Sequence, residues 1–259
     1  MKDPQISVDH LERIDAILLS FVASYVDTAV FVGLFGLFTS HVTGNFVLIG
    51  AALVHHADGV ETKLLALPVF VLAIAATVLA VRALERRGRR PLPPLLIAEA
   101  FFLVISACAP TLMGSAIRPE NSAAAMVTGM LAVFAMGLQN AYMRIKLGAL
   151  PPTTIMTGNV TQATIDALAI VSTSAPAPDR DAAARRFARM WPAIAAFTIG
   201  AALGAFGFIV AGLLCLVVPA ALCLVLAARF GGLGAASCSV TTVTRPSARG
   251  ARHGYTLRP

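Results

Sequence analysis

The sequence predicts an all-α integral membrane protein with six long transmembrane helices, two short re-entrant or broken half-helices, and an inverted 3+3 internal repeat. Three observations support this fold class. Hydrophobic residues make up 58% of the 259 positions and charged residues only 13%, whereas a soluble domain carries about 25% charged residues. A polar motif, T-[ST]-x-apolar-T-G-N, occurs twice, at residues 39–45 and 153–159. The arginines cluster in segments that lie on one side of a six-crossing topology.

Long apolar stretches define the long helices. About 20 apolar residues are enough to span a bilayer, and one uncharged stretch, 193–228, is far longer than that. We expect it to be divided near Gly207, where small residues at four-residue spacing (Gly200 and Gly204 among them) suit close helix packing. The six expected helices are 14–38, 64–84, 92–113, 122–147, 187–206 and 208–229.

Each copy of the motif is followed by a short helical segment, 45–55 and 159–172. The first is about 16 Å long at 1.5 Å per residue, too short for a hydrocarbon core of about 30 Å. The second is longer but carries polar side chains, Asp166 among them. Backbone breaks at membrane depth survive only when they are buried in protein or line a cavity, so we expect half-helices there.

Loop charges support inversion of the two halves. Arginine clusters occupy 82–90, 180–189 and 245–258, and all three lie inside if the N-terminus is cytoplasmic. Each half has three crossings, an odd number, so the second half is upside down relative to the first. The expected segments are a cytoplasmic N-terminus (1–12), a first membrane repeat (13–117), a second membrane repeat (118–230) and a disordered basic cytoplasmic tail (231–259).

Asp27 is the most notable single residue. It lies about 20 Å along the first predicted helix, and a carboxylate near mid-membrane is expensive unless it faces a cavity or a partner. It could bind a proton, a sodium ion or a cationic group, or it could hold helices together. Its counterpart in the second repeat is Asn140, next to Gln139. Across a pseudo-two-fold axis these three residues form either one asymmetric polar site or a set of interhelical hydrogen bonds.

The two T-G-N triplets are the other candidate binding elements. Thr43, Gly44 and Asn45 in the first copy match Thr157, Gly158 and Asn159 in the second, with an offset of 114 residues. Threonine or asparagine can cap a short helix, glycine permits a tight turn, and the helix N-terminus favours an anion. The alternative is that each motif only turns the chain.

Three further residues are candidates for a proton relay. His41 replaces Ile155 of the second copy and could titrate near neutral pH. Glu99 and Asp166 lie within apolar segments. Each could equally be a hydrogen-bonded structural residue.

Several classes of function are not expected. The four cysteines lie apart, with no CxxC pair, and the chain has no metal-ligand spacing, nucleotide-binding loop or nucleophile elbow. We therefore expect no cofactor, no metal and no enzyme activity. The net charge of +7 is explained by insertion topology, so no nucleic-acid partner is expected.

The segments Tyr25-Val26-Asp27, Ser40-His41-Val42-Thr43-Gly44-Asn45, Gly137-Leu138-Gln139-Asn140-Ala141 and Thr157-Gly158-Asn159 resemble the YoaK-like family. These are bacterial inner-membrane proteins that carry a domain of unknown function. The resemblance covers roughly residues 12–230 and implies a plasma-membrane protein of about six helices, without naming a substrate.

The first functional hypothesis is a secondary transporter or permease for a small polar solute, driven by protons or sodium. It would sit in the inner membrane with both termini cytoplasmic. The second is a membrane scaffold or accessory protein whose polar residues only hold helices together. The sequence leaves substrate, coupling ion, direction and oligomeric state open, a homo-oligomer included.

Overall fold

The computed structural model describes residues 4–55, 59–113, 122–172 and 176–238. Their secondary structure is helical throughout. The helices are α1 (Pro4–Gly33), α2 (Gly44–His55), α3 (Val60–Arg86), α4 (Leu92–Leu112), α5 (Ala123–Lys146), α6 (Met156–Val171), α7 (Ala177–Ala211), the 3₁₀ helix η1 (Gly212–Leu216) and α8 (Val217–Cys238). The tail arginines, together with Arg118 and Glu120, lie outside the described residues.

Length and composition identify five helices able to cross a membrane. The sequence predicted six, and the difference arises because α7, η1 and α8 count as one continuous helical run of 56 residues, Ala177–Gly232. That run is not straight. The break falls at Gly212, whose φ of 57° and ψ of −147° suit a residue without a side chain. The predicted division near Gly207 is thus five residues early.

The first predicted helix is also too long. α1 ends at Gly33 instead of Phe38, because Phe35 and Gly36 adopt left-handed conformations (φ 55° and 80°) that reverse the chain. The two short helices are present where the sequence placed them. α2 begins one residue earlier than predicted and α6 three residues earlier. α8 continues to Cys238, eight residues into the segment expected to be a tail.

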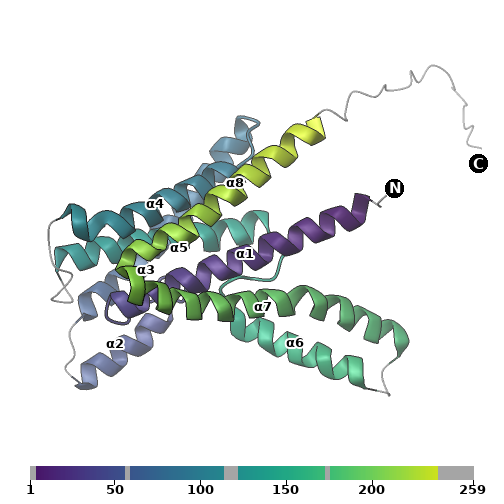
Figure 1. The fold of residues 1–259 in the computed structure, drawn as a ribbon, viewed down its shortest axis with the longest axis horizontal. Helices are drawn as coiled ribbons and strands as arrows, with labels where there is room; N and C mark the ends of the chain where they lie inside the picture. The colour runs from purple at the N-terminus through teal and green to yellow at the C-terminus, as the bar shows by residue number, and fades with distance from the viewer. Residues whose placement is uncertain (1–3, 56–58, 114–121, 173–175, 239–259) are drawn as a thin grey trace, which may run out of the picture.

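The long helices pack side by side in one bundle, and the short helices α2 and α6 lie at its edge (Figure 1). α1 packs along α7, and α3 packs along α5. α4 lies between α5 and α8, and α8 also touches α1. The two short helices pack on neighbouring long ones, α2 on α3 and α6 on α7.

Close approach of α1 and α7 depends on small residues. A side chain at Gly200 would lie 2.6 Å from the Phe21 carbonyl, and one at Gly204 would collide with the backbone of Tyr25. This spacing of small residues is the device that membrane helices use to bring their backbones together. α1 is therefore held firmly along its length, and the residues near its end are fixed in position.

The core has two parts. The larger cluster brings together buried residues of α1, α4, α5, η1 and α8, with Val26, Leu103 and Met136 among the completely enclosed side chains. The smaller cluster surrounds Tyr142 and Leu96. Many large apolar side chains lie exposed on the outer faces of the helices, as expected of a surface covered by lipid.

Candidate functional site

The polar site is built where the chain turns back after α1. The segment after Gly33 folds against the helix and brings Thr39 and Ser40 onto the Asp27 carboxylate. Asp27 Oδ1 accepts hydrogen bonds from the Thr39 backbone N–H (2.7 Å), the Thr39 hydroxyl (2.9 Å) and the Ser40 backbone N–H (2.7 Å). Backbone groups that leave a helix in an apolar environment need partners. Asp27 supplies them to the first motif.

The second Asp27 oxygen holds His41. His41 Nδ1 lies 2.6 Å from Asp27 Oδ2, and the histidine side chain is 33% exposed while that of the aspartate is 7% exposed. The hydrogen bond to Asp27 and the attraction of its charge raise the pKa of His41 above its ordinary value, against the opposing effect of burial. The imidazole also meets the ring of Phe197 edge-on, at 5.8 Å between centroids.

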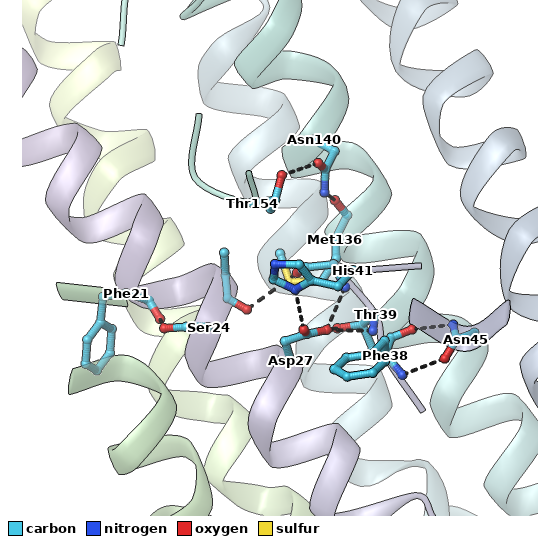
Figure 2. A network of polar contacts seen from close by, with 12 residues as sticks. Phe21, Ser24, Asp27, Phe38, Thr39, His41, Asn45, Met136, Asn140 and Thr154 are labelled. Carbon is cyan, nitrogen blue, oxygen red and sulfur yellow. Dashed lines mark hydrogen bonds and ion pairs between the residues drawn. The ribbon is translucent and has the colours of Figure 1, made fainter. Parts of the chain in front are cut away.

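His41 connects the two motifs. The backbone of Thr154, in the second copy, adds to the raised pKa of His41, so the imidazole lies close to that backbone. The Thr154 hydroxyl donates to Asn140 Oδ1 at 2.6 Å, and Asn140 Nδ2 donates to the Met136 carbonyl at 2.9 Å. Figure 2 shows the contact of Asp27 with His41 and that of Asn140 with Thr154, with His41 and Thr154 between the two ends.

Gln139 ties the second motif to α1. Its Nε2 donates to the Leu19 carbonyl (2.8 Å) and to the Thr153 hydroxyl (3.3 Å). Gln139 is completely buried, and its Oε1 accepts no hydrogen bond from the described residues. Thr153 is the counterpart of Thr39. The same motif position is therefore bound by the Asp27 carboxylate in the first half and by the Gln139 amide in the second.

The asparagines of the two T-G-N triplets are buried and hold the turns that precede them. Asn45 accepts from the Phe38 N–H and donates to the Phe38 carbonyl, both at 2.9 Å. Asn159 donates to the Pro152 carbonyl at 2.7 Å. Phe38 and Pro152 are 114 residues apart, the repeat offset, so the two contacts are equivalent. Proline has no N–H, and the second turn has only one of the two bonds.

The other members of the triplets lie at the surface of the protein. Thr43, Thr157 and Gly158 are exposed, and Gly44 is partly buried. No side chain caps α6, so the expected capping role is not found there. At the start of α2, the N–H groups of Gly44, Asn45 and Phe46 donate to the carbonyls three residues earlier in the turn. These donors are therefore already used, and the start of α2 has little left to offer an anion.

Glu99 lies apart from this site, at the junction of α4, α5 and α8. It is fully buried, and its Oε2 accepts a hydrogen bond from the Tyr142 hydroxyl at 2.7 Å. Glu99 Oε1 has no hydrogen-bond partner among the described residues. No described residue forms an ion pair with this carboxyl group.

Asp166 is also separate, because it belongs to the packing of α6 on α7. Its buried carboxylate receives Arg186 Nη2 at 2.7 Å and Nε at 3.1 Å, with Gln162 Nε2 at 3.1 Å. The guanidinium is 52% exposed. The structure therefore brings Asp27, His41 and Asn140 together, while Glu99 and Asp166 each have their own surroundings.

A cavity of about 320 Å³ lies beside the second motif. Asn140 and Arg144 of α5 form one wall, and residues 152–155 of the second motif and the turn before it form another. Thr154 therefore touches both the cavity and the imidazole of His41. No group of three or more histidine, cysteine, aspartate or glutamate side chains in the described part of the chain could hold a metal ion.

Comparison with known families finds one match. The model of the family described as "Protein of unknown function (DUF1275)" matches residues 16–229, which is most of the chain. The protein belongs to the DUF1275 family. No curated protein and no solved structure matches it. The matched range agrees with the extent expected from the resemblance, and the YoaK-like designation itself stays an expectation.

Within the DUF1275 match lie residues that the sequence analysis did not single out for the site. Thr39, Ser40, Thr153 and Thr154 open the two motifs and make the contacts to Asp27, Gln139 and Asn140. The signal was present, because Thr39 and Thr153 are identical and Ser40 and Thr154 both carry a hydroxyl at the repeat offset. Tyr142 and Arg186, the partners of the two separate carboxyl groups, carried no such signal.

Proposed function

We propose that this DUF1275 protein is a secondary transporter for a small polar solute, coupled to protons, in the bacterial inner membrane. One observation carries the proposal. A titratable pair, Asp27 and His41, is joined through Thr154 to a cavity lined by Asn140. Transporters need a solute site and an ion site whose occupancies affect one another, and this arrangement supplies a direct physical link between the two.

The helix pairings support an inverted repeat. If α1, α2, α3 and α4 correspond to α5, α6, α7 and α8, the pairing of α1 with α7 corresponds to that of α5 with α3. Likewise, α2 on α3 corresponds to α6 on α7, and α4 on α5 corresponds to α8 on α1. Each observed pair thus has its counterpart, as a two-fold axis in the membrane plane requires. On this reading the broken first segments of the two halves meet at the site.

Six crossings and two cytoplasmic termini complete the proposed topology. The reversal at Gly212 divides α7 from α8 and supplies the sixth crossing. Arg229 Nη2 and Asp15 Oδ1 lie 3.1 Å apart, so the end of α8 and the start of α1 are on the same side. An even number of crossings requires this, and the arginines of 82–90 identify that side as cytoplasmic.

The coupling ion that fits the Asp27–His41 pair best is a proton, carried by His41. A sodium ion needs several oxygen ligands around it, as hard cations do. Asp27 is instead surrounded by donors: two backbone N–H groups, a hydroxyl and an imidazole nitrogen. A proton on His41 strengthens its attraction to Asp27, and its loss weakens it. Because His41 also contacts Thr154, its charge state affects the wall of the cavity.

The test is solute-dependent proton movement in liposomes that contain the purified protein and a pH-sensitive dye. A library of sugars, amino acids, amines and organic acids is added outside, one solute at a time. We expect at least one class to drive proton flux in the wild type and none in Asp27→Asn. Glu85→Gln is the matched control, because Glu85 is an exposed acid paired with Lys146 at 2.5 Å, away from the site. Equal flux in wild type and Asp27→Asn would refute the role of Asp27.

The second candidate function is a scaffold or accessory protein without transport. It is favoured by the hydrogen bonds of Asp27 and Asn45, which are all made to residues of the turn after α1, Phe38 to His41. On this reading, Asp27→Asn lowers thermal stability in detergent, and no solute in the library changes the stability of the wild type. A solute that stabilises the wild type in a pH-dependent way would exclude it.

A further inference from the structure

Arg144 is the one cation in the wall of the cavity described above, and it also lines a second cavity. This cavity, of about 260 Å³, lies between α3 and α5. Asn140 and Arg144 border both cavities. They are four residues apart, one turn of α5, so their side chains project from the same face of the helix. The two hollows therefore share a polar edge.

Arg144 has no acidic partner among the described residues, whereas two other cations of the structure do. Lys146, two positions along, pairs with Glu85 at 2.5 Å, and Arg186 holds Asp166 at 2.7 Å. Arg144 is exposed, and the other polar side chains that line the first cavity belong to Asn140, Thr153 and Thr154. A positive charge that faces a cavity without a counter-ion favours an anion there.

The second cavity is apolar apart from this edge. Phe70, Ile74 and Val78 form its α3 side. They are spaced four residues apart and so make one continuous stripe. A ligand that uses both features needs a negatively charged end and a short hydrocarbon body.

Resting on the proposed function, we propose that the solute is a small organic anion, a carboxylate with a short apolar body. The guanidinium of Arg144 would receive both carboxylate oxygens in its planar fork. Asn140 Nδ2 has a second hydrogen to donate beyond the one bonded to Met136. The apolar body would lie against Phe70, Ile74 and Val78.

Charge balance connects this ligand to the proton site. A monocarboxylate that moves alone carries a negative charge across the membrane potential. A carboxylate that moves together with one proton carries none. Asp27 and His41 hold that proton one contact away from the cavity, through Thr154.

Thermal unfolding of the detergent-solubilised full chain tests the proposal. The probes are acetate, butyrate and benzoate, with benzamide as the neutral analogue of benzoate and inorganic phosphate as an anion without a hydrocarbon body. We expect butyrate or benzoate to raise the unfolding temperature of the wild type, and benzamide at the same concentration to leave it unchanged. Arg144→Gln should abolish the rise. Lys146→Gln, which removes a cation paired elsewhere, should retain it.

Four results would overturn the proposal. They are no stabilisation by any of the three carboxylates, equal stabilisation by benzamide, a full response in Arg144→Gln, and stabilisation by phosphate alone. Its failure is distinguishable from that of the proposed function. Proton flux driven only by a neutral or cationic solute would refute the proposal of an anionic solute and leave the proposal of a transporter standing. Binding of benzoate through Arg144 without proton flux for any solute would refute proton-coupled transport and leave the anion site standing.

Discussion

His41 Nδ1 lies 2.6 Å from Asp27 Oδ2, although 14 positions separate the two residues. The contact closes the turn after α1 onto the helix and leaves the imidazole touching the second motif. His41 thus contacts both the turn after α1 and the second motif, and a change in its charge affects both. The corresponding position of the second motif is Ile155, which cannot titrate. The site is therefore asymmetric in its chemistry.

The stability of the protein should depend on the protonation of His41. Asp27 raises the pKa of His41 in the folded state above its unfolded value of about 6.5. The contribution of the His41–Asp27 contact to the free energy of unfolding is therefore complete below about pH 6.5 and is lost as the pH rises through the pKa of His41 in the folded state. We expect His41→Gln to lower the unfolding temperature most at pH 5.5, with the gap to wild type shrinking at alkaline pH. A gap that is constant from pH 5.5 to 9 would contradict this.

The two T-G-N asparagines should contribute unequally. Asn45 makes two hydrogen bonds to Phe38 and Asn159 makes one to Pro152, and an interhelical or turn hydrogen bond in a membrane protein contributes about 1 kcal/mol. Asn45→Ala should therefore destabilise more than Asn159→Ala, by about 1 kcal/mol. Unfolding in detergent with increasing denaturant measures the difference. Equal losses would show that the second Phe38 bond contributes nothing.

The contact of α1 with α7 should not tolerate a methyl group. Gly204→Ala places a Cβ against the backbone of Tyr25, and overpacking of this kind costs about 1–3 kcal/mol. Gly50→Ala is the matched control, because a Cβ there meets nothing within 4 Å. Thermal unfolding of the two variants should separate them clearly. A Gly204→Ala protein as stable as wild type would mean that the helices move apart freely.

The ion pair of α6 and α7 should be sensitive to loss of the arginine alone. Arg186→Met leaves the buried Asp166 carboxylate with Gln162 as its remaining donor. We expect a measurable loss of stability, smaller than that for a fully enclosed pair because the Arg186 side chain is 52% exposed. The double variant Asp166→Asn/Arg186→Met should recover part of that loss. Additive effects in this double-mutant cycle would refute a direct coupling.

Much of the architecture follows from patterns that a sequence displays directly. Apolar length located the long helices, and the repeated motif located α2 and α6. The ends of helices were less accessible. Phe38 is as apolar as the residues before it, and only the backbone conformations of Phe35 and Gly36 end α1 five residues earlier. Gly207 and Gly212 are equally plausible breaks by composition. In the structure Gly207 lies within α7, and Gly212 adopts the positive φ that ends it.

The site was accessible in part for a related reason. Asp27 and Asn140 stand out because polar residues in apolar helices are rare. Their surroundings could not be predicted, because the sequence does not show that the turn after α1 folds back and surrounds the Asp27 carboxylate. Asp27 was expected in a cavity or beside a partner, and it lies among the donors of its own turn. The cavity itself lies beside Asn140 instead.

Pro152 fixes a lasting difference between the two turns. No rotation of Asn159 can create the second hydrogen bond, because the atom that would donate it does not exist. The turn beside the cavity therefore lacks one hydrogen bond that the turn after α1 has. Amide exchange with solvent should proceed faster around Thr153 and Thr154 than around Thr39 and Ser40. In a protein that opens alternately to the two sides of the membrane, the side closed by the turn with fewer hydrogen bonds opens at the lower cost in free energy.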